Sequence, residues 1–350
     1  MNLTDEQTKA LYGVVTDIRN GEDEISLGGY AGTGKTSLIK YLIKFFPEFC
    51  VCAYTGKAAN VLRKKNISAT TIHSRIYKPF FDNGVMYFDL TDDPGCDGFI
   101  VDEASMVSEE IYQDLKQFGL PMIFVGDHGQ LEPIESKLNL MEKPDYVLEQ
   151  IHRNAGDIPR FADHLRKGFS SRGFKGQDGT VEFVKERNIT DETLMSVDQI
   201  ICAFNKTRVE INKRIREILG FEDLINVGER VMCLKNSRRQ GLFNGMQGTV
   251  VNLYEYKRGQ YMDFEFDGQI IEGIRYDTHQ FGQEKYKIKF GQNDPIPFDY
   301  CNAITAHKSQ GDEFDSVLVY EQKCNKWEHK RWAYTAASRA RTNLKWKIAT

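Results

Sequence analysis

The feature that constrains this chain most is a glycine-rich turn between a short apolar segment and an amphipathic one. Ile25-Ser26-Leu27 is predicted to form a strand, and residues 35–46 a helix that ends before Pro47. The turn between them, Gly29-Tyr30-Ala31-Gly32-Thr33-Gly34-Lys35-Thr36, matches the pattern G-x-x-x-x-G-K-[ST]. Glycines in this pattern let backbone N–H groups turn toward phosphate oxygens at the positive end of a helix. We therefore expect a phosphate-binding loop.

The residue types of this loop predict its chemistry. Lys35 is expected to reach the β- and γ-phosphates of a nucleotide, and the Thr36 hydroxyl to hold Mg²⁺. The predicted nucleotide contacts are Gly29, Ala31, Gly32, Thr33, Gly34, Lys35 and Thr36. The alternative is a glycine-rich turn without this chemistry, and the strand and helix on either side argue against it.

Two further apolar segments end in residues that suit phosphate chemistry. Phe99 to Val101 leads into Asp102, which suits Mg²⁺ binding through water, and Glu103, which suits polarisation of an attacking water. Val125 leads into a polar turn in which Gln130 is a candidate sensor of the γ-phosphate. Taken in isolation, that turn is only a loop.

Two arginines in the second half of the chain are candidates for stabilising a transferring phosphoryl group. Arg153 lies where the second half begins, and Arg339 lies near the chain end. The planar guanidinium fork suits the charge that develops on phosphoryl oxygens. If the second domain faces the first across a cleft, either arginine can complete the nucleotide site only when that cleft closes. The alternative for each is a surface or salt-bridge arginine.

The alternation of apolar strands and helical segments predicts an α/β fold with parallel sheets. The chain has 350 residues, which is enough for two domains. A second αβ pattern follows Arg153, with predicted strands at residues 199–204 and 316–320 and predicted helices at residues 207–219 and 331–339. From residue 228 to residue 298 the pattern changes to short alternating strands, which predicts a small antiparallel β insertion or barrel.

Charge and cysteine content bound the function further. The formal net charge is -4, but residues 1–150 hold 14 Lys+Arg against 23 Asp+Glu, so the remaining residues are net basic and able to meet a polyanion. The seven cysteines include no Cys-x-x-Cys pair, which favours a reduced cytoplasmic protein over a disulfide scaffold or a zinc site. No apolar stretch approaches the ~18 residues of a membrane span, and the N-terminus lacks a signal-peptide profile.

The ordered set of motifs resembles superfamily 1 helicases of the RecD/Dda-like branch. The segments that carry the resemblance are Gly29 to Thr36, Ala53 to Ala59, Thr71 to Ser74, Val101 to Met106, Gly126 to Pro133, Gly228 to Met232, Asn244 to Val250, Asn302 to Asp315 and Tyr334 to Arg341. They extend over nearly the whole chain.

This resemblance implies a domain organisation. Residues 1–150 would form a RecA-like ATP-binding domain with an insert at about residues 75–98. Residues 151–227 and 299–350 would form a second RecA-like motor domain, and residues 228–298 an SH3-like β insertion.

The resemblance also implies ATP-driven 5′→3′ translocation on single-stranded DNA and duplex unwinding, with ATP and Mg²⁺ as cofactors. The chain is expected to act as a monomer at duplex junctions in a bacterial or phage-infected cytoplasm, with replication or recombination proteins as partners. The predicted catalytic residues are Lys35, Asp102, Glu103, Gln130, Arg153 and Arg339, and Gly311, Glu313 and the adenine-reading Gln7 join the nucleotide contacts. The predicted DNA contacts are Thr55, Lys57, Thr71, His73, Pro133, Asn205, Thr305, His307 and Lys308.

Several alternatives stay open at this point. Thr4 and Gln7 also match a capping box, and both roles of Gln7 hold only if its side chain is not committed to the cap. Tyr54 replaces the family's usual proline, and Ser338 its usual threonine. Aromatic residues in the short insert could wedge a duplex or form a local core. The competing functions are a translocase that barely unwinds DNA, a phosphotransferase on a small metabolite and a non-catalytic DNA-binding module.

Overall fold

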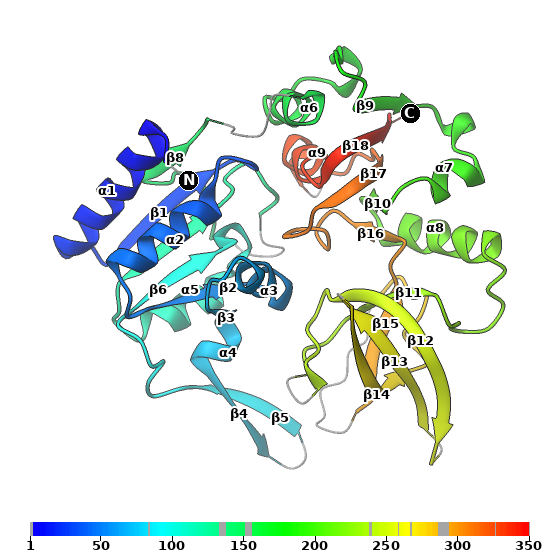
Figure 1. The fold of residues 1–350 in the computed structure, drawn as a ribbon, viewed down its shortest axis with the longest axis horizontal. Coiled ribbons are helices and arrows are strands. Elements are labelled where there is room, and N and C mark those ends of the chain that lie inside the picture. Colours follow the sequence, from blue (N-terminus) through cyan, green and yellow to red (C-terminus); the bar gives the residue numbers. More distant parts are fainter. Residues whose placement is uncertain are drawn as a thin grey trace. The chain divides into compact units, whose positions relative to one another are not determined.

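The computed structural model describes residues 3–82, 85–132, 138–150, 156–237, 240–257, 259–266, 268–285, 294–325 and 327–349, with only the backbone described for residues 79–82 and 85–88. The predicted site residues Pro133 and Arg153 lie outside the described residues, as do the side chains of most insert aromatics. The chain divides into two compact units (Figure 1). The first contains Met1–Phe81 and Tyr87–Pro159, and the second contains Arg160–Thr350 together with the short segment Asp82–Met86. The first unit thus ends a few residues beyond the predicted boundary at residue 150.

The first unit is built on a six-stranded parallel sheet with strand order β3-β2-β6-β7-β1-β8. Its strands are β1 (Glu24–Gly29), β2 (Phe49–Ala53), β3 (Ala69–Thr71), β6 (Gly98–Asp102), β7 (Met122–Gly126) and β8 (Tyr146–Leu148). Its helices are α1 (Asp5–Arg19), α2 (Lys35–Phe45), α3 (Gly56–Lys64), α4 (Ile72–Ile76), the 3-10 turn η1 (Ala104–Met106) and α5 (Glu109–Lys116).

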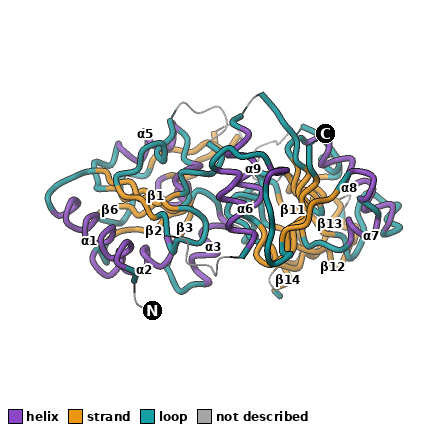
Figure 2. Tube along the Cα trace, turned by 90° about the horizontal axis from the view of Figure 1, so that it is seen from above, coloured by secondary structure: helices purple, strands orange, loops and turns teal. Residues whose placement is uncertain are grey.

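Helices cover both faces of this sheet, because alternate strand residues are apolar on both sides. Ile100 and Ile123 pack with α1, α2 and α3, whereas Phe99 and Val101 pack with α5. Figure 2 shows the strands of this unit between α5 on one side and α1 with α2 on the other. The predicted α/β architecture is confirmed for this unit.

The insert in the first unit contains a two-stranded sheet formed by β4 (Tyr77–Asp82) and β5 (Val85–Leu90). The Tyr77 hydroxyl donates to the Asp114 carboxylate on α5, and the Tyr77 ring lies 5.4 Å from the His73 ring. Tyr77 is therefore held by its own unit. Whether the other aromatics of the insert act as a wedge stays a prediction.

The second unit contains a five-stranded parallel sheet with strand order β16-β10-β17-β18-β9. Its strands are β9 (Val181–Val184), β10 (Gln199–Cys202), β16 (Ala303–Thr305), β17 (Phe314–Tyr320) and β18 (Ala340–Lys347). The helical elements are α6 (Asp157–Arg166), the 3-10 turns η2 (Ser171–Gly173) and η3 (Glu186–Asn188), α7 (Asp191–Met195), α8 (Asn205–Ile218) and α9 (His329–Ala337).

The predicted β insertion is a closed barrel of β11 (Arg230–Cys233), β12 (Gln247–Tyr256), β13 (Gly259–Phe266), β14 (Gln269–Asp277) and β15 (Ile296–Tyr300). Its pairings are antiparallel except for β14 with β15, which run parallel and close the barrel. Apolar side chains such as Val250, Phe264 and Phe298 fill the interior.

Three predicted helix boundaries in this unit are wrong by two residues, and one of them is the start of the helix expected from Arg331, which begins at His329. The helix expected from Thr207 begins at Asn205, with Phe204 as an N-cap that makes no side-chain capping bond. The helix expected to reach Arg339 is α9, which ends at Ala337, so Arg339 follows the helix and precedes β18. At each of these points the helix begins or ends without a side-chain capping bond that the sequence could reveal. Of the helices that the structure describes, none combines the length and the apolar character needed to cross a membrane.

A buried ion pair joins α8 to the barrel. Arg208 donates to the Asp299 carboxylate, and the two side chains are 1% and 0% exposed. Asp299 also accepts from the backbone N–H groups of Gly282 and Tyr300, both at 2.8 Å. Burial raises the pKa of Asp299, and the positive charge of Arg208 opposes that rise.

We expect Asp299→Asn to lower the free energy of unfolding of the second unit by about 3–5 kcal/mol, because it leaves the Arg208 charge buried without a counter-charge. Urea denaturation followed by circular dichroism measures this change. The control is Asp191→Asn, which breaks an exposed pair with Arg214 at 2.7 Å and should cost less than about 1 kcal/mol. Equal losses in the two variants would contradict the structural role of the buried pair.

Candidate nucleotide and DNA sites

The predicted phosphate-binding loop has the backbone conformation that an anion site needs. Gly32 and Gly34 have φ of 85° and 88°, values that residues with a Cβ rarely adopt. Gly34 is the N-cap of α2, and neither a side-chain cap nor an acidic residue occupies its first turn. N–H groups at the start of α2 can therefore donate to a phosphate at the positive end of the helix.

Lys35 lies folded over this loop. Its ammonium donates to the carbonyl oxygens of Gly29 at 2.7 Å and Tyr30 at 3.1 Å. Both acceptors are neutral, so a phosphate oxygen would be a stronger partner for the same group. The loop is closed by the Thr33 hydroxyl, which donates to the Tyr30 carbonyl at 2.8 Å.

Gln7 connects α1 to the loop. The capping box is confirmed: the Thr4 N–H donates to Gln7 Oε1 at 3.1 Å, and the Gln7 N–H donates to Thr4 Oγ1 at 3.3 Å. Gln7 Nε2 also donates to the Thr33 carbonyl at 2.9 Å. Each end of the amide thus makes one bond to the protein, and each has the capacity for a second. The adenine role of Gln7 stays a prediction.

The two predicted acids lie where β6 ends. Burial raises the pKa of Asp102, and the positive charges of Lys35 and Lys65 and the Glu103 N–H oppose that rise. Glu103 has φ of 56°, in the left-handed region that residues with a Cβ seldom occupy. Strained backbone of this kind is common at sites where a side chain must point in one direction.

Gln130 lies in the turn after β7 and is buried. Its Nε2 donates to Asp127 Oδ2 at 3.0 Å, while Asp127 Oδ1 accepts from the Gly129 N–H at 3.0 Å. The His128 ring in the same turn packs against the Tyr30 ring of the phosphate loop, with centroids 4.2 Å apart. This turn therefore lies beside the phosphate-binding loop.

Sequence reasoning missed two residues at this site. His128 was expected only as part of the turn, and nothing in the sequence indicates its contact with Tyr30. Lys65 donates to the Thr36 hydroxyl at 3.5 Å and contributes to the electrostatics of Asp102. It follows Arg63 and Lys64 in the sequence, and no local pattern distinguishes it from them.

The predicted DNA contacts of the first unit lie at the carboxyl ends of β2 and β3. Thr55 caps α3 by accepting from the Ala58 N–H at 3.1 Å, and Lys57 lies in the first turn of that helix. Thr71 caps α4 by accepting from the Ser74 N–H at 3.1 Å. Burial lowers the pKa of His73, so its neutral form is favoured. The threonines have local structural roles, and their DNA roles stay predictions.

The predicted contacts of the second unit gather in a similar way. Thr305 ends β16, and its hydroxyl accepts from the Lys308 N–H at 3.4 Å. Lys308 Nζ donates to Asn244 Oδ1 at 3.1 Å, which links this turn to the barrel region, and burial lowers the Lys308 pKa. Burial also lowers the pKa of His307. Asn205 begins α8 after β10, Gly311 has φ of 80°, and Glu313 is exposed.

Arg339 is buried within the second unit. It donates to the carbonyls of Thr335 at 3.0 Å and Asp312 at 3.1 Å, and to the Ser338 hydroxyl at 2.8 Å, with a longer contact of 3.5 Å to the Ser309 carbonyl. The guanidinium thus joins the end of α9 to the turn that follows β16. Ser338 supplies the hydroxyl expected of the family's threonine.

Comparison with known proteins agrees with this arrangement. A family model described as an AAA domain matches residues 2–186, which is more than half of the chain. A second model, described as a UvrD-like helicase C-terminal domain, matches residues 300–344.

Named relatives share the same pattern. The chain is 25% identical to the ATP-dependent DNA helicase Pif1 of Bdellovibrio bacteriovorus, over 98% of this chain and 86% of that protein. It is also 25% identical to the ATP-dependent DNA helicase Dda of Enterobacteria phage T4, over 62% of this chain and 57% of that protein. The chain spans only 30% to 42% of the length of several other curated relatives.

The fold matches that of Bacteroides Pif1 bound to single-stranded DNA, with a TM-score of 0.63 and 20% identity over 99% of this chain and 92% of that one. Identity this low shows a shared fold. The family models and the named relatives agree on one family. The chain belongs to the AAA-domain family and, within it, to the RecD/Pif1-like group of superfamily 1 helicases.

Proposed function

We propose that this chain is an ATP-dependent DNA helicase that translocates 5′→3′ on single-stranded DNA and unwinds duplex. The observation that supports it best is the convergence of the phosphate loop, Asp102, Glu103 and the Gln130 turn at the carboxyl ends of β1, β6 and β7 in one sheet. These strands are neighbours, so residues that follow them are close together. The relatives with helicase names support the choice of DNA as the track.

In this proposal a nucleotide phosphate replaces the carbonyl partners of Lys35 and receives the N–H groups at the start of α2. Thr36 and Asp102 offer a hydroxyl and a carboxylate, the oxygen ligands that Mg²⁺ prefers, so the residues present fit this ion. Mg²⁺ would supply positive charge to the β- and γ-phosphates. Its charge would also lower the pKa of Asp102 and favour the ionised carboxylate.

Glu103 would orient and polarise the attacking water, and Gln130 would contact the γ-phosphate. Gln7 has one N–H and one lone pair remaining after its contacts with Thr4 and Thr33. This pair matches the acceptor and donor on the edge of adenine. Because the capping box already uses Oε1, the adenine role requires both Oε1 and Nε2 of Gln7 to take a second partner.

Arg339 would supply positive charge to the transferring phosphoryl group, and Arg153 would act with it. The described partners of Arg339 are carbonyl and hydroxyl oxygens, so its charge is not neutralised by a carboxylate there. Replacing these neutral acceptors by phosphate oxygens would be electrostatically favourable.

The strand would contact Thr55, Lys57, Thr71 and His73 on the first unit, and Asn205, Thr305, His307 and Lys308 on the second. We further propose that the protein acts as a monomer at duplex junctions during DNA replication, recombination or repair. Seven free cysteines fit a reducing cytoplasm.

Lys35→Ala is expected to reduce the DNA-stimulated ATPase rate by at least roughly 100-fold, because it removes the cation that contacts the β- and γ-phosphates. Steady-state phosphate release with and without single-stranded DNA measures the effect. Lys40→Ala, which alters an exposed lysine of the same helix, should retain near-normal turnover. Normal turnover in Lys35→Ala would remove the basis for the ATPase assignment.

Arg339→Ala is expected to retain ATP binding and to lose hydrolysis by roughly 1,000-fold, as for other arginines that stabilise phosphoryl transfer. Fluorescent-nucleotide titration and single-turnover hydrolysis separate the two steps. The control is Arg341→Ala, whose exposed guanidinium pairs with Asp315 at 2.7 Å. Because Arg339 also holds backbone carbonyls, unfolding is monitored in parallel. Equal loss of binding and hydrolysis in a folded variant would contradict the role.

With ATP present, duplexes with a 5′ single-stranded tail should be unwound and those with a 3′ tail should not. A strand-displacement assay with matched tails measures this. Preference for the 3′ tail would overturn the polarity. ATP hydrolysis and directional movement without displacement would identify a translocase that unwinds weakly, and ATPase activity unaffected by DNA would favour a phosphotransferase.

A further inference from the structure

Three aromatic rings follow three neighbouring strands of the second unit. Phe204 follows β10, His307 follows β16 and Trp327 follows β17, and these strands are adjacent in the sheet. The ring centroids of Phe204 and Trp327 lie 5.8 Å apart, and those of Trp327 and His307 lie 5.6 Å apart. We call these three residues the aromatic row.

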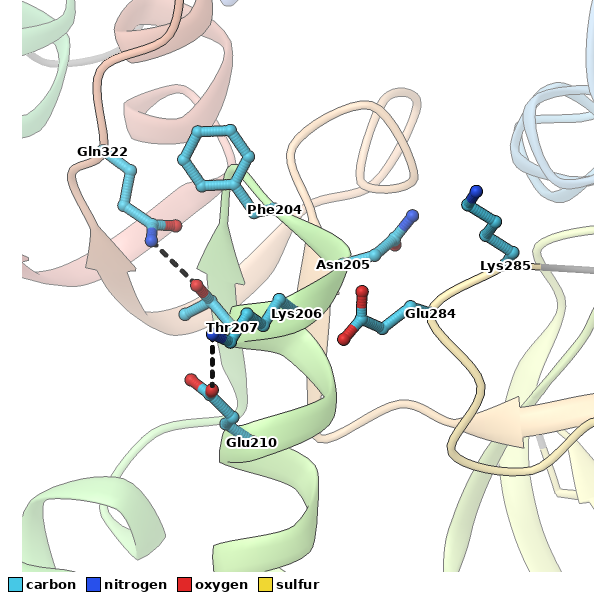
Figure 3. Close-up of a pocket in the computed structure, with 8 residues that line it drawn as sticks. All are labelled: Phe204, Asn205, Lys206, Thr207, Glu210, Glu284, Lys285 and Gln322. Carbon is cyan, nitrogen blue, oxygen red and sulfur yellow. Dashed lines mark hydrogen bonds and ion pairs between the residues drawn. The ribbon is translucent and has the colours of Figure 1, made fainter.

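One residue of the aromatic row, Phe204, borders a pocket of about 640 Å³. Phe204 lines it together with Asn205, Lys206, Thr207, Glu210, Glu284, Lys285 and Gln322. Figure 3 shows Lys206 and Thr207 at the start of α8, with Glu284 and Lys285 on the segment that faces them. The pocket is large enough for a planar ring with polar edges.

The charges that line this pocket do not favour a phosphate. Lys206 and Lys285 are matched by Glu210 and Glu284, and Lys206 Nζ lies 4.0 Å from a Glu210 carboxylate oxygen. A surface that holds phosphates has an excess of positive charge. A neutral aromatic ligand carries no negative charge, so it needs no excess of positive charge in the pocket.

The rim of the pocket is fixed by hydrogen bonds. Gln322 Oε1 accepts from the Ala203 N–H at 3.0 Å, and Gln322 Nε2 donates to Thr207 Oγ1 at 2.8 Å. Asn205 Oδ1 accepts from Arg208 at 3.2 Å. The backbone on either side of Phe204 is thus held in place, which keeps the ring available to a ligand.

The aromatic row differs from the aromatic core of the same unit. Trp332 and Trp346 are both 0% exposed and pack inside the fold. Phe204, His307 and Trp327 all retain partial exposure. This partial exposure leaves the three rings open to contact with a ligand.

We propose that the aromatic row is a base-stacking site for single-stranded DNA, in which a base of the bound strand packs on Trp327, with Phe204 beside it at the pocket. Every base has a flat π-face, so this contact would hold the strand without selecting its sequence. The inference rests on the proposed function, because it names how that function's DNA is held. His307 is already a predicted DNA contact, and the aromatic row extends that contact to two further rings.

The chain reports on this site through its own fluorescence. It has three tryptophans, and Trp327 is the one that is partly exposed. Nucleotide-free full-length protein is titrated with an oligothymidylate of roughly a dozen nucleotides, and with an abasic strand that has the same phosphates. We expect oligothymidylate to quench part of the emission, and the abasic strand to bind without quenching.

Substitutions separate stacking from structure. Trp327→Leu should weaken oligothymidylate binding roughly tenfold, the loss expected for one stacked base, and leave abasic-strand binding unchanged. Trp327→Phe should remove the quenching and keep the affinity within about twofold, because phenylalanine also stacks. The control Phe169→Leu alters a more exposed aromatic of the same unit and should change neither signal.

Unchanged oligothymidylate affinity in Trp327→Leu would overturn the inference, as would an equal loss for both strands, which indicates a structural role. If the parent protein binds oligothymidylate and hydrolyses ATP without quenching, stacking at Trp327 is wrong and the helicase proposal stands. If it binds neither strand and its ATPase ignores DNA, both proposals are wrong.

Discussion

The structure depends on one constraint of parallel sheets: each strand must be connected to the next by a crossover, so all carboxyl ends lie at the same edge. In the first unit this edge collects the phosphate loop after β1, the acids after β6 and the Gln130 turn after β7. In the second unit the same rule gathers Phe204, His307 and Trp327. Functional residues that are far apart in the sequence therefore lie close together because of the strands they follow. They need no direct contacts with one another to be placed there.

This constraint explains how much could be predicted. The strand–glycine turn–helix pattern predicted the phosphate loop. The apolar segments that end in polar residues predicted the places of Asp102, Glu103 and Gln130, and the alternating segment predicted the barrel. What failed has physical reasons. The start of α8 at Asn205 has no capping side chain to reveal it. The contact of Lys65 with Thr36 joins residues 29 positions apart, and the packing of His128 on Tyr30 joins two loops. Such contacts depend on tertiary geometry and leave no local pattern in the sequence.

Arg339 occupies a position that connects two kinds of site. Its guanidinium holds the Asp312 carbonyl and approaches that of Ser309, in the turn that also contains Thr305, His307 and Lys308. In the proposed function, any movement of Arg339 toward a nucleotide would release these carbonyls. The turn predicted to contact DNA would then lose one of its supports. In that function, these hydrogen bonds within a single unit would link the nucleotide state to the contacts with the DNA strand.

Glu103 has a side chain that suits the proposed reaction but a backbone conformation that is unfavourable for a residue with a Cβ. Its φ of 56° costs on the order of 1–3 kcal/mol in a residue with a Cβ, and glycine would avoid that cost. Selection for thermal stability alone would therefore remove the carboxylate that the proposed reaction needs. In the proposed function, glycine at this position would relieve the backbone and abolish turnover, so a variant stabilised by optimising its backbone alone would be inactive.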